Sequence, residues 1–363
     1  MGTLEAKNTN ALISAAAVIV IIYGMQAAKV LLVPFLLAVF LALITVRPML
    51  WLQQKKVPSI AAALLIVITM MLILAVVGAI VGSSIGEFTA ALPAYQERLE
   101  IIEKSALEFL ARISGSEKSF SDLGELIDPG WAMGMAAAIL TALQDVLTNV
   151  FLILFTMVFI LLEVSSAAVK AQAAFGVSTG TLERPRAFVS NLGRYLGIKT
   201  LVSVATGLTA GLVTWWIGLD FPLLWAMLAF LFNYVPTIGS IIAAVPAVLL
   251  ALVQLGPGDA LTTALGFLGI NMVFGNMLEP RLMGRGVGIS PLVIFAGLVL
   301  WGWIFGPVGM LLSVPLTMTV KMALESNEQT RWAAILIGSE QDAEWELAHR
   351  MNVDKEESSL DTS

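Results

Sequence analysis

A group of polar and ionisable residues lies in an otherwise apolar segment, residues 271–290. A helix would place Asn271, Gly275 and Glu279 on one face, with Asn276 beside them, because residues four apart stack one above the other. Polar groups inside a bilayer are costly, so they tend to line a pathway or to pair with one another. The pattern predicts a solute or ion path. The alternative is an ordinary helix end at the membrane surface, with Glu279 and Arg281 as an interfacial ion pair.

The end of this segment predicts a structural role for its charges. Pro280 directly follows Glu279 and should stop or kink the helix, because proline lacks a backbone N–H and its ring crowds the preceding turn. Arg281 or Arg285 would then compensate the Glu279 carboxylate and fix the end of the helix.

Composition places the chain in the membrane. Hydrophobic residues make up 58% and charged residues 13% of the sequence, and the mean hydropathy is +0.90, whereas soluble proteins are roughly 25% charged. The sequence contains no cysteine and a single histidine, His349, in a polar tail. It shows no paired carboxylates, no nucleophile with a histidine and no phosphate-binding loop. We therefore predict no catalytic residues, metal, cofactor or nucleic-acid partner, and no direct use of ATP.

Apolar runs predict about six full transmembrane helices. They cover residues 11–28, 30–46, 60–82, 146–162, 196–217 and 259–278. The first two follow each other closely enough to suggest a retained helical hairpin and not a cleaved signal peptide. Arg47, Lys55 and Lys56 lie in the loop before the third run, and basic loops mark the cytoplasmic side. Both chain termini are therefore expected in the cytoplasm.

Residues 83–145 differ from their surroundings, since they are rich in charge and should form an extracytoplasmic insert. An amphipathic helix is expected to begin at Leu92-Pro93, and a second helix at Asp128-Pro129. The apolar face of the first of these helices would be formed by residues at three- and four-residue spacing: Leu99, Ile102, Ala106, Phe109 and Ile113. The insert could serve as a gate or a subunit contact, and the alternative is a solvated cap.

Two long apolar stretches, residues 221–254 and 290–324, are interrupted in their middle, at 233–240 and 301–309. The same number of residues separates Pro222 from Pro246 and Pro291 from Pro315. Each half is too short to cross a bilayer comfortably, so we predict two helix-break-helix, re-entrant hairpins. The alternative is that each stretch forms two tight ordinary spans.

In the expected topology, each hairpin follows a transmembrane span. The two repeats of a span and a hairpin then have opposite orientations in the membrane, as in the inverted repeats of secondary transporters. The predicted fold is thus an all-α integral membrane protein. Its parts are three N-terminal helices (1–82), the insert (83–145), a helix and cytoplasmic connector (146–195), a transport core (196–325) and a cytoplasmic polar tail (326–363).

The two breaks should lie at similar depth and face each other across a substrate path. The predicted path residues are Asn233, Tyr234, Pro236, Thr237, Gly239, Ser240, Asn271, Gly275, Asn276, Gly306, Pro307 and Gly309.

Three segments carry a resemblance to a known family: NYVPTIGSIIAAVP, FGNMLEPRLMGRGVGISPLV and LVLWGWIFGPVGMLLSVPLTMTVKMALE. They resemble signature segments of the autoinducer-2 exporter family of bacterial membrane proteins. The similarity extends from Val33 to Glu325, and the EPR-x-MG and GPVGMLLSVPL patterns are its specific parts. The resemblance implies a multi-pass protein of the bacterial inner membrane that forms a homo-oligomer, plausibly a pentamer, with an elevator-like moving domain.

Three functions follow from these observations. The resemblance implies export of the small polar signal autoinducer-2, and the neutral hydrogen-bonding residues of the path suit such a solute. Other family members are reported to exchange sodium or lithium for protons, and Glu279 is the one good candidate for the titratable carboxylate that antiport would need. A non-transport membrane scaffold is the third reading.

Overall fold

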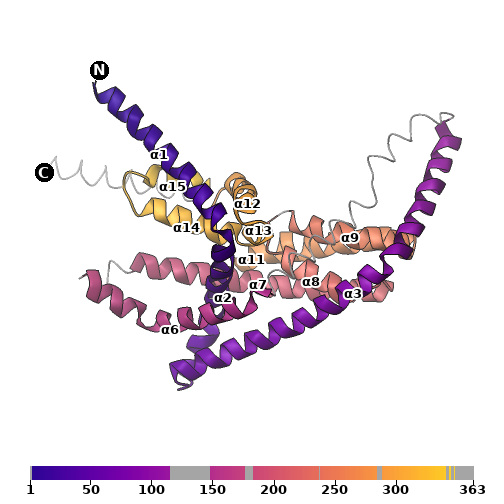
Figure 1. The fold of residues 1–363 in the computed structure, drawn as a ribbon, viewed down its shortest axis with the longest axis horizontal. Coiled ribbons are helices and arrows are strands. Elements are labelled where there is room, and N and C mark those ends of the chain that lie inside the picture. The colour runs from indigo at the N-terminus through magenta and orange to yellow at the C-terminus, as the bar shows by residue number, and fades with distance from the viewer. Residues whose placement is uncertain are drawn as a thin grey trace. The chain divides into compact units, whose positions relative to one another are not determined.

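The computed structural model describes residues 2–114, 148–175, 183–236, 238–283 and 288–340, together with 343, 344 and 347. Every regular element in these residues is a helix (Figure 1). In chain order they are α1 Gly2–Ala27, α2 Lys29–Gln54, α3 Ser59–Ser114, α6 Val150–Phe175, α7 Glu183–Ile217, α8 Pro222–Phe232, α9 Gly239–Gln254, α10 Pro257–Ile270, the π-helix η3 Asn271–Leu278, α11 Glu279–Met283, α12 Pro291–Phe305, α13 Pro307–Leu311, α14 Ser313–Glu325 and α15 Arg331–Ile337.

Four described helical segments are long and apolar enough to cross a bilayer: Lys29–Gln54, Ser59–Ser84, Ala187–Ile217 and Pro257–Met283. Shorter apolar helices accompany them, among them α8, α9 and α12. Large apolar side chains such as Val30, Leu31 and Phe151 are exposed on these helices, as expected where lipid is the solvent. The prediction of an all-helical membrane protein is confirmed, and the number of complete crossings stays a prediction.

The N-terminal helices differ from the expected hairpin. A single residue, Ala28, separates α1 from α2, and its N–H donates to the carbonyl of Gly24. The N–H groups of Leu31 and Leu32 in turn donate to the carbonyl of Ala28. Because helical bonds continue almost without interruption, α2 leads on from α1 through a bend and the chain does not reverse there (Figure 1).

Helix α3 is longer than the sequence suggested. It runs through the expected boundary at residue 83 and contains Pro93 within it, so Leu92-Pro93 is not a helix start. A proline inside a helix removes one hydrogen bond and commonly bends the helix, and α3 is bent (Figure 1). Asp128-Pro129 and the side chains of the predicted apolar face, Leu99, Ile102, Ala106, Phe109 and Ile113, lie outside the described residues.

The chain forms two compact units, each assembled from separate segments. The first unit comprises Met1–Ile44, Glu163–Tyr195 and Met283–Ser363, and the second comprises Thr45–Leu162 and Leu196–Leu282. Residues 196–325, which we expected to act as the transport core, are thus divided between the two units.

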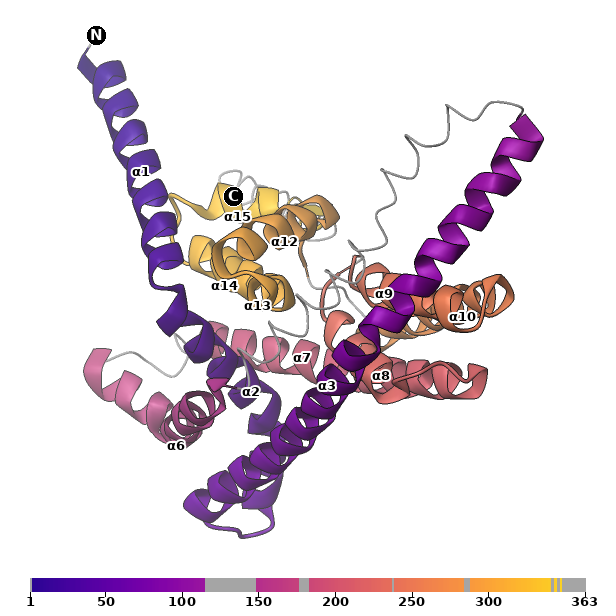
Figure 2. The same ribbon diagram turned by 45° about the vertical axis from the view of Figure 1, so that its right-hand side comes forward.

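The second unit contains the first helix-break-helix hairpin, α8 and α9, beside α10 (Figure 2). Its core is built around fully buried side chains that include Trp225, Leu228 and Leu250, and Phe267 of α10 joins them. Helix α8 begins at a proline, where the missing N–H would be unpaired anyway, and ends at the predicted break. Pro246 lies inside α9 without interrupting it.

The first unit contains the second hairpin, formed by α12, α13 and α14. Its interruption is shorter than predicted, because α12 continues through Trp301 to Phe305 and stops at Gly306, which has a φ of 70°. Such a backbone favours glycine, and Pro307 then begins α13. Buried Trp301, Ile304 and Phe305 pack against α1 and α2 side chains such as Val33.

A glycine in each hairpin permits close contact between its two arms. A Cβ at Gly239 would overlap the carbonyl oxygen of Phe232, and a Cβ at Gly309 would overlap that of Trp301. Any side chain there would force the arms apart, since no other residue type leaves this space empty. The two hairpins therefore share this close contact between a glycine and a main-chain carbonyl, as well as their proline spacing.

Candidate functional site

Helix α7 carries a row of polar side chains on one buried face. Lys199, Ser203 and Thr206 follow helical spacing, and their exposed fractions are 5%, 0% and 8%. Thr200 lies beside them. We call these four residues the α7 polar stripe. The opposite side of the helix is apolar and exposed, with Leu201, Leu208, Leu212, Trp215 and Trp216. A row of buried polar groups on the protein-facing side of a membrane-crossing helix marks an interior polar site.

The charged end of the stripe is an ion pair. The Lys199 Nζ atom lies 2.6 Å from Oε1 and 2.8 Å from Oε2 of Glu279, and both side chains are largely buried. Lys199 is therefore the partner of Glu279, in place of the expected Arg281, while Arg285 lies outside the described residues. Arg281 is exposed. A buried pair of this geometry compensates two charges that would be expensive singly.

A π-helix brings Glu279 to this position. The Glu279 N–H donates to the carbonyl of Phe274, which is the wide i→i+5 pattern of η3. Upstream, Oδ1 of Asn271 lies 2.8 Å from the place where a Cβ of Gly275 would stand. Asn271 and Gly275 thus lie next to each other on η3. Segments of π-helix are frequent at functional sites.

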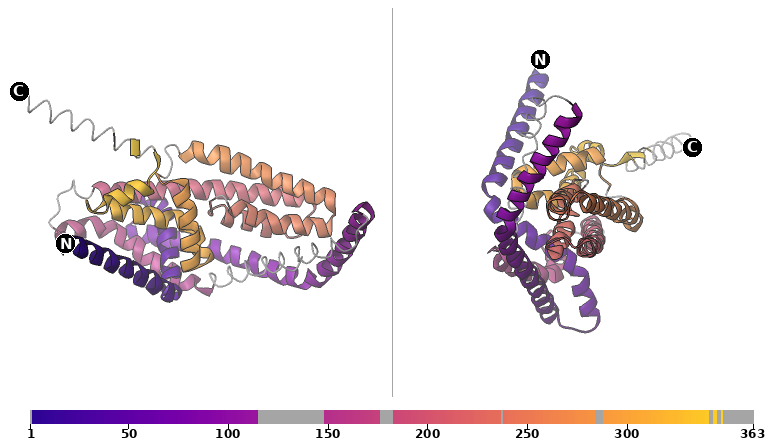
Figure 3. Two further views of the ribbon diagram at one scale, coloured as in Figure 1. Left: turned by 90° about the horizontal axis from the view of Figure 1, so that it is seen from above. Right: turned by 90° about the vertical axis from the view of Figure 1, so that its right-hand side faces the viewer.

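Pro280 does not stop this helix. The chain stays helical from α10 through η3 to Met283 at the end of α11 (Figure 3). In an α-helix, the ring of Pro280 would crowd the carbonyl four residues earlier and remove its hydrogen bond. The wider turn of η3 lies directly upstream and can accommodate the proline, which explains why the helix does not stop there.

Residues at the break of the first hairpin are hydrogen-bonded to the middle of the α7 polar stripe. Asn233 donates from Nδ2 to the Ser203 hydroxyl over 2.9 Å, and the Tyr234 hydroxyl donates to Thr200 Oγ1 over 2.7 Å. Thr200 in turn donates to the carbonyl of Leu196. Tyr234 is 7% exposed, so these bonds lie in a water-poor environment where an unmade hydrogen bond is costly. The tip of the hairpin is held on α7 by neutral polar groups.

Two glycines let α8 approach α7 beyond this tip. A Cβ at Gly207 would stand 2.6 Å from the carbonyl oxygen of Ala226, and a Cβ at Gly211 would stand 2.8 Å from the Ala226 Cβ. Their spacing is the small-xxx-small pattern that allows membrane helices to pack closely. The position of the hairpin along α7 is therefore fixed by packing as well as by hydrogen bonds.

The mouth of the first hairpin, Asp220 and Gln254 at its two ends, is tied together. The Asp220 N–H donates to Gln254 Oε1 over 2.9 Å, and Trp225 Nε1 donates to the Asp220 carbonyl over 2.7 Å. From α3, the Tyr95 hydroxyl donates to Asp220 Oδ2 over 2.7 Å. Burial is the main cause that raises the pKa of Tyr95 above its usual value, and the hydrogen bond to Asp220 raises it further. The extension of α3 is thus anchored to the hairpin.

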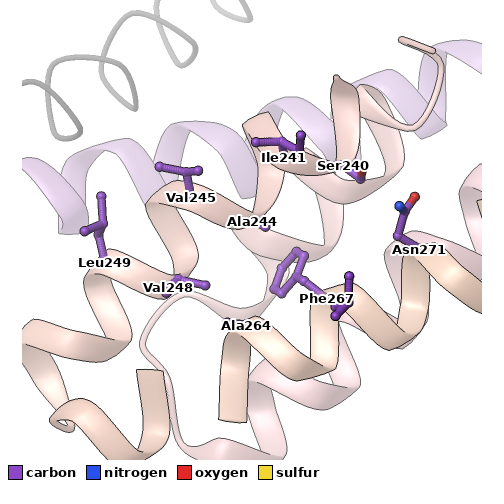
Figure 4. Close-up of a pocket in the computed structure, with 10 residues that line it drawn as sticks. Ser240, Ile241, Ala244, Val245, Val248, Leu249, Ala264, Phe267 and Asn271 are labelled. Atoms are coloured by element: carbon purple, nitrogen blue, oxygen red, sulfur yellow. The ribbon is translucent and has the colours of Figure 1, made fainter. Parts of the chain in front are cut away.

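A cavity of about 380 Å³ lies between α9 and α10 (Figure 4). Most of its lining is apolar, with Phe267 pointing into it, and Ser240 and Asn271 lie together at one end. Its size is within the range of small-molecule sites, which combine apolar walls with a few polar groups. Two residues predicted for the substrate path, Ser240 and Asn271, therefore line one cavity.

The remaining predicted path residues are more dispersed. Asn276 is exposed on η3, Pro236 is half-buried in the turn of the first hairpin, and Thr237 lies outside the described residues. Gly306, Pro307 and Gly309 belong to the second hairpin, in the other compact unit. Their expected position opposite the first hairpin stays a prediction.

Sequence reasoning missed the α7 polar stripe. The predicted run at residues 196–217 contains Lys199, Ser203 and Thr206, and their helical spacing in an apolar segment was a usable signal. Among the described residues, no group of three or more acidic, histidine or cysteine side chains could hold a metal ion. The site instead offers hydroxyl, amide and phenol groups beside a charge-compensated pair, which suits hydrogen bonding to an uncharged polar solute.

The chain is similar to known membrane transport proteins. The family described as AI-2E family transporter matches residues 13–329. The AI-2 transport protein TqsA of Escherichia coli K12 is 38% identical over 319 residues, covering 88% of this chain and 92% of that protein. A putative transport protein of Haemophilus influenzae is 36% identical over 337 residues, covering 91% and 97%. The putative transport protein YhhT of E. coli K12 is 34% identical over 337 residues, covering 90% and 93%.

Proposed function

Because the chain belongs to the AI-2E family of transporters, we propose that it exports autoinducer-2 across the bacterial inner membrane by an alternating-access, elevator-like mechanism. The similarity to a protein named for AI-2 transport supports the substrate. The main structural support is the contact between the first hairpin and the α7 polar stripe. It combines neutral donors and acceptors with a pair whose charges cancel, so a polar but uncharged solute would meet no isolated charge.

The proposed path passes between the hairpin tip and α7. The bonds from Asn233 to Ser203 and from Tyr234 to Thr200 close the contact in this state. A passing solute must replace these bonds with its own, because the hydroxyls would otherwise be left unpaired in a buried place. In the proposed arrangement, both termini lie in the cytoplasm and the functional form is a homo-oligomer, a pentamer.

Transport by purified protein in proteoliposomes tests the proposal. Accumulation of autoinducer-2 and sodium-dependent proton flux are measured on the same preparation, with protein-free liposomes as the control. We expect movement of the signal without cation coupling. Sodium-driven proton flux without movement of autoinducer-2 would reject export in favour of antiport.

Sodium or lithium exchange for protons is the second candidate because a carboxylate, Glu279, lies within the membrane-crossing segment. Its pairing with Lys199 argues against this function, since an incoming cation would have to displace an ammonium group held at 2.6 Å. Glu279→Gln separates the two candidates. Under antiport, this variant would assemble normally and lose only the pH dependence of transport.

The relation between the two hairpins is tested by cross-linking. In this cysteine-free chain, cysteines introduced at Thr237 and Val308 should form a disulfide in at least one transport state, because both breaks are proposed to border one path. Single variants provide the controls. If the two sites react freely with reagents dissolved in lipid, or never cross-link, the paired-hairpin arrangement is wrong.

A further inference from the structure

The threonines of α7 differ in how they use their hydroxyl groups. Thr200, Thr209 and Thr214 each donate to the carbonyl four residues earlier, at 2.7, 2.8 and 2.9 Å. This is the ordinary way in which a threonine is satisfied in an apolar helix. The Thr206 hydroxyl has no hydrogen-bond partner among the described residues, although Thr206 is only 8% exposed.

A buried hydroxyl without a partner destabilises the fold, because it has given up its bonds to water without replacement. Its own helix offers Thr206 the carbonyl of Val202, the equivalent of the acceptors that the other threonines use. A hydroxyl kept away from this acceptor remains available to another molecule. Valine has nearly the same shape and would fill the position without this cost, so a binding role accounts for the threonine.

The position of Thr206 extends the site already described. It lies one helical turn beyond Ser203 on the same face of α7, and Ser203 accepts the bond from Asn233 at the hairpin tip. At its neighbour Gly207, α8 lies so close that an added Cβ would stand 2.6 Å from the carbonyl oxygen of Ala226. Two hydroxyls one turn apart, with an amide facing them, match a small molecule that carries neighbouring hydroxyl or carbonyl groups.

We propose that Thr206, Ser203 and Asn233 form a subsite for the hydroxyl groups of a small, uncharged, polyhydroxylated solute. When the hairpin tip moves off α7, the solute bonds to Ser203 in place of Asn233 and satisfies the Thr206 hydroxyl. The identity of the solute as autoinducer-2 rests on the proposed function, whereas the subsite itself rests on the unpartnered hydroxyl.

Substitutions that keep or remove this hydroxyl test the subsite in proteoliposomes. Thr206→Val should lower the rate of autoinducer-2 transport about 3- to 10-fold, the factor expected for one hydrogen bond, and should raise the melting temperature. Thr206→Ser should transport like the wild type. The matched control, Thr209→Val, removes a hydroxyl that is bonded within the helix, and its transport should be unchanged.

Two results would overturn the subsite. One is wild-type transport by Thr206→Val. The other is a parallel loss of transport and melting temperature in that variant, which would assign Thr206 a packing role.

Cysteine labelling tests the subsite even if the wild type does not transport autoinducer-2, a result that would reject the proposed function alone. The chain contains no cysteine, so Thr206→Cys and Thr209→Cys can each be probed singly with a small water-soluble thiol reagent. Thr209 is the more exposed of the two and shares its helix face with exposed Leu212 and Trp216. We expect faster labelling at position 206, because a polar path brings water to it. Equal labelling, or faster labelling at 209, would contradict the subsite.

Discussion

The two hairpins share a backbone design but are held in place by different forces. In both, a proline begins the first arm and a glycine, Gly239 or Gly309, lies against a carbonyl of that arm. The tip of the first hairpin donates hydrogen bonds to α7, a separate helix. In the second hairpin, Trp301 Nε1 donates over 3.1 Å to Thr317 of the same hairpin.

The mouths of the hairpins differ as well. Asp220 and Gln254 join the ends of the first hairpin, and Tyr95 ties them to α3. At the second, the Lys321 ammonium donates over 2.6 Å to the carbonyl of Gly288, and the Ser290 N–H donates to the carbonyl of Ile337. The first arm of the second hairpin also packs against α1 and α2 through the buried side chains of Trp301, Ile304 and Phe305. A solute can replace the hydrogen bonds between the first hairpin and α7, whereas this apolar contact offers it no bonds to exchange. We therefore expect the first hairpin to be the one that responds to substrate.

The largest effect should come from the ion pair beside the first hairpin. Lys199→Met leaves the Glu279 carboxylate buried without compensation, which typically costs about 3–5 kcal/mol. The unfolding free energy in detergent should fall by this amount, and the double variant Lys199→Met with Glu279→Met should recover most of it. Glu279→Ala should likewise impair folding as well as transport.

A second ion pair supplies the control. Lys170 and Glu163 lie 2.7 Å apart, almost as close as Lys199 and Glu279, but their side chains are 65% and 56% exposed. Lys170→Met should therefore cost less than about 1 kcal/mol. Equal losses for Lys199→Met and Lys170→Met would show that burial does not distinguish the pairs and would remove the structural role assigned to Glu279.

The sequence predicted what depends on local geometry and missed what depends on distant contacts. Proline and glycine act through their own backbone, so the break near Asn233 and the one at Gly306 could be located. Lys199 and Glu279 are 80 residues apart, and no local pattern links them. Hydropathy alone predicts the run at residues 196–217 without singling out Lys199, and the standard effect of Pro280 gives no hint of the π-helix before it. The polar stripe needed the tertiary structure to become visible.

Substitution of the glycine that contacts a main-chain carbonyl in each hairpin should give the next largest effect. Gly239→Ala and Gly309→Ala each place a Cβ against a main-chain carbonyl, which cannot move without separating the two arms. Overpacking of this kind costs roughly 1–3 kcal/mol, and the cost should be similar in both hairpins. Gly269→Ala in α10 is the control, since nothing lies within 4 Å of the added methyl group. Thermal unfolding in detergent measures all three. A large loss at one tip glycine alone would show that the hairpins are not equivalent.

The smallest effect concerns the mouth of the first hairpin. Tyr95→Phe removes the bond to Asp220 and should lower the unfolding free energy by about 0.5–1.5 kcal/mol at neutral pH. The pKa of Tyr95 is raised in the folded protein, so above the ordinary tyrosine pKa of about 10 the unfolded chain loses this proton first. Wild-type stability should consequently fall as pH rises beyond that value, and Tyr95→Phe should show a weaker fall. Parallel curves for the two proteins would exclude the contribution of Tyr95.

The π-helix at Asn271–Leu278 determines the rotational phase of the helix that follows it. An i→i+5 turn takes up one more residue than an α-turn, so every side chain after Leu278 points in a direction different from the one an uninterrupted α-helix would give it. If these eight residues rewound into α-helix, Glu279 would rotate around the axis away from Lys199 without any change in the pair itself. The buried ion pair of Lys199 and Glu279 is thus governed by the backbone winding next to it, and a change in that winding would open the pair by rotation alone.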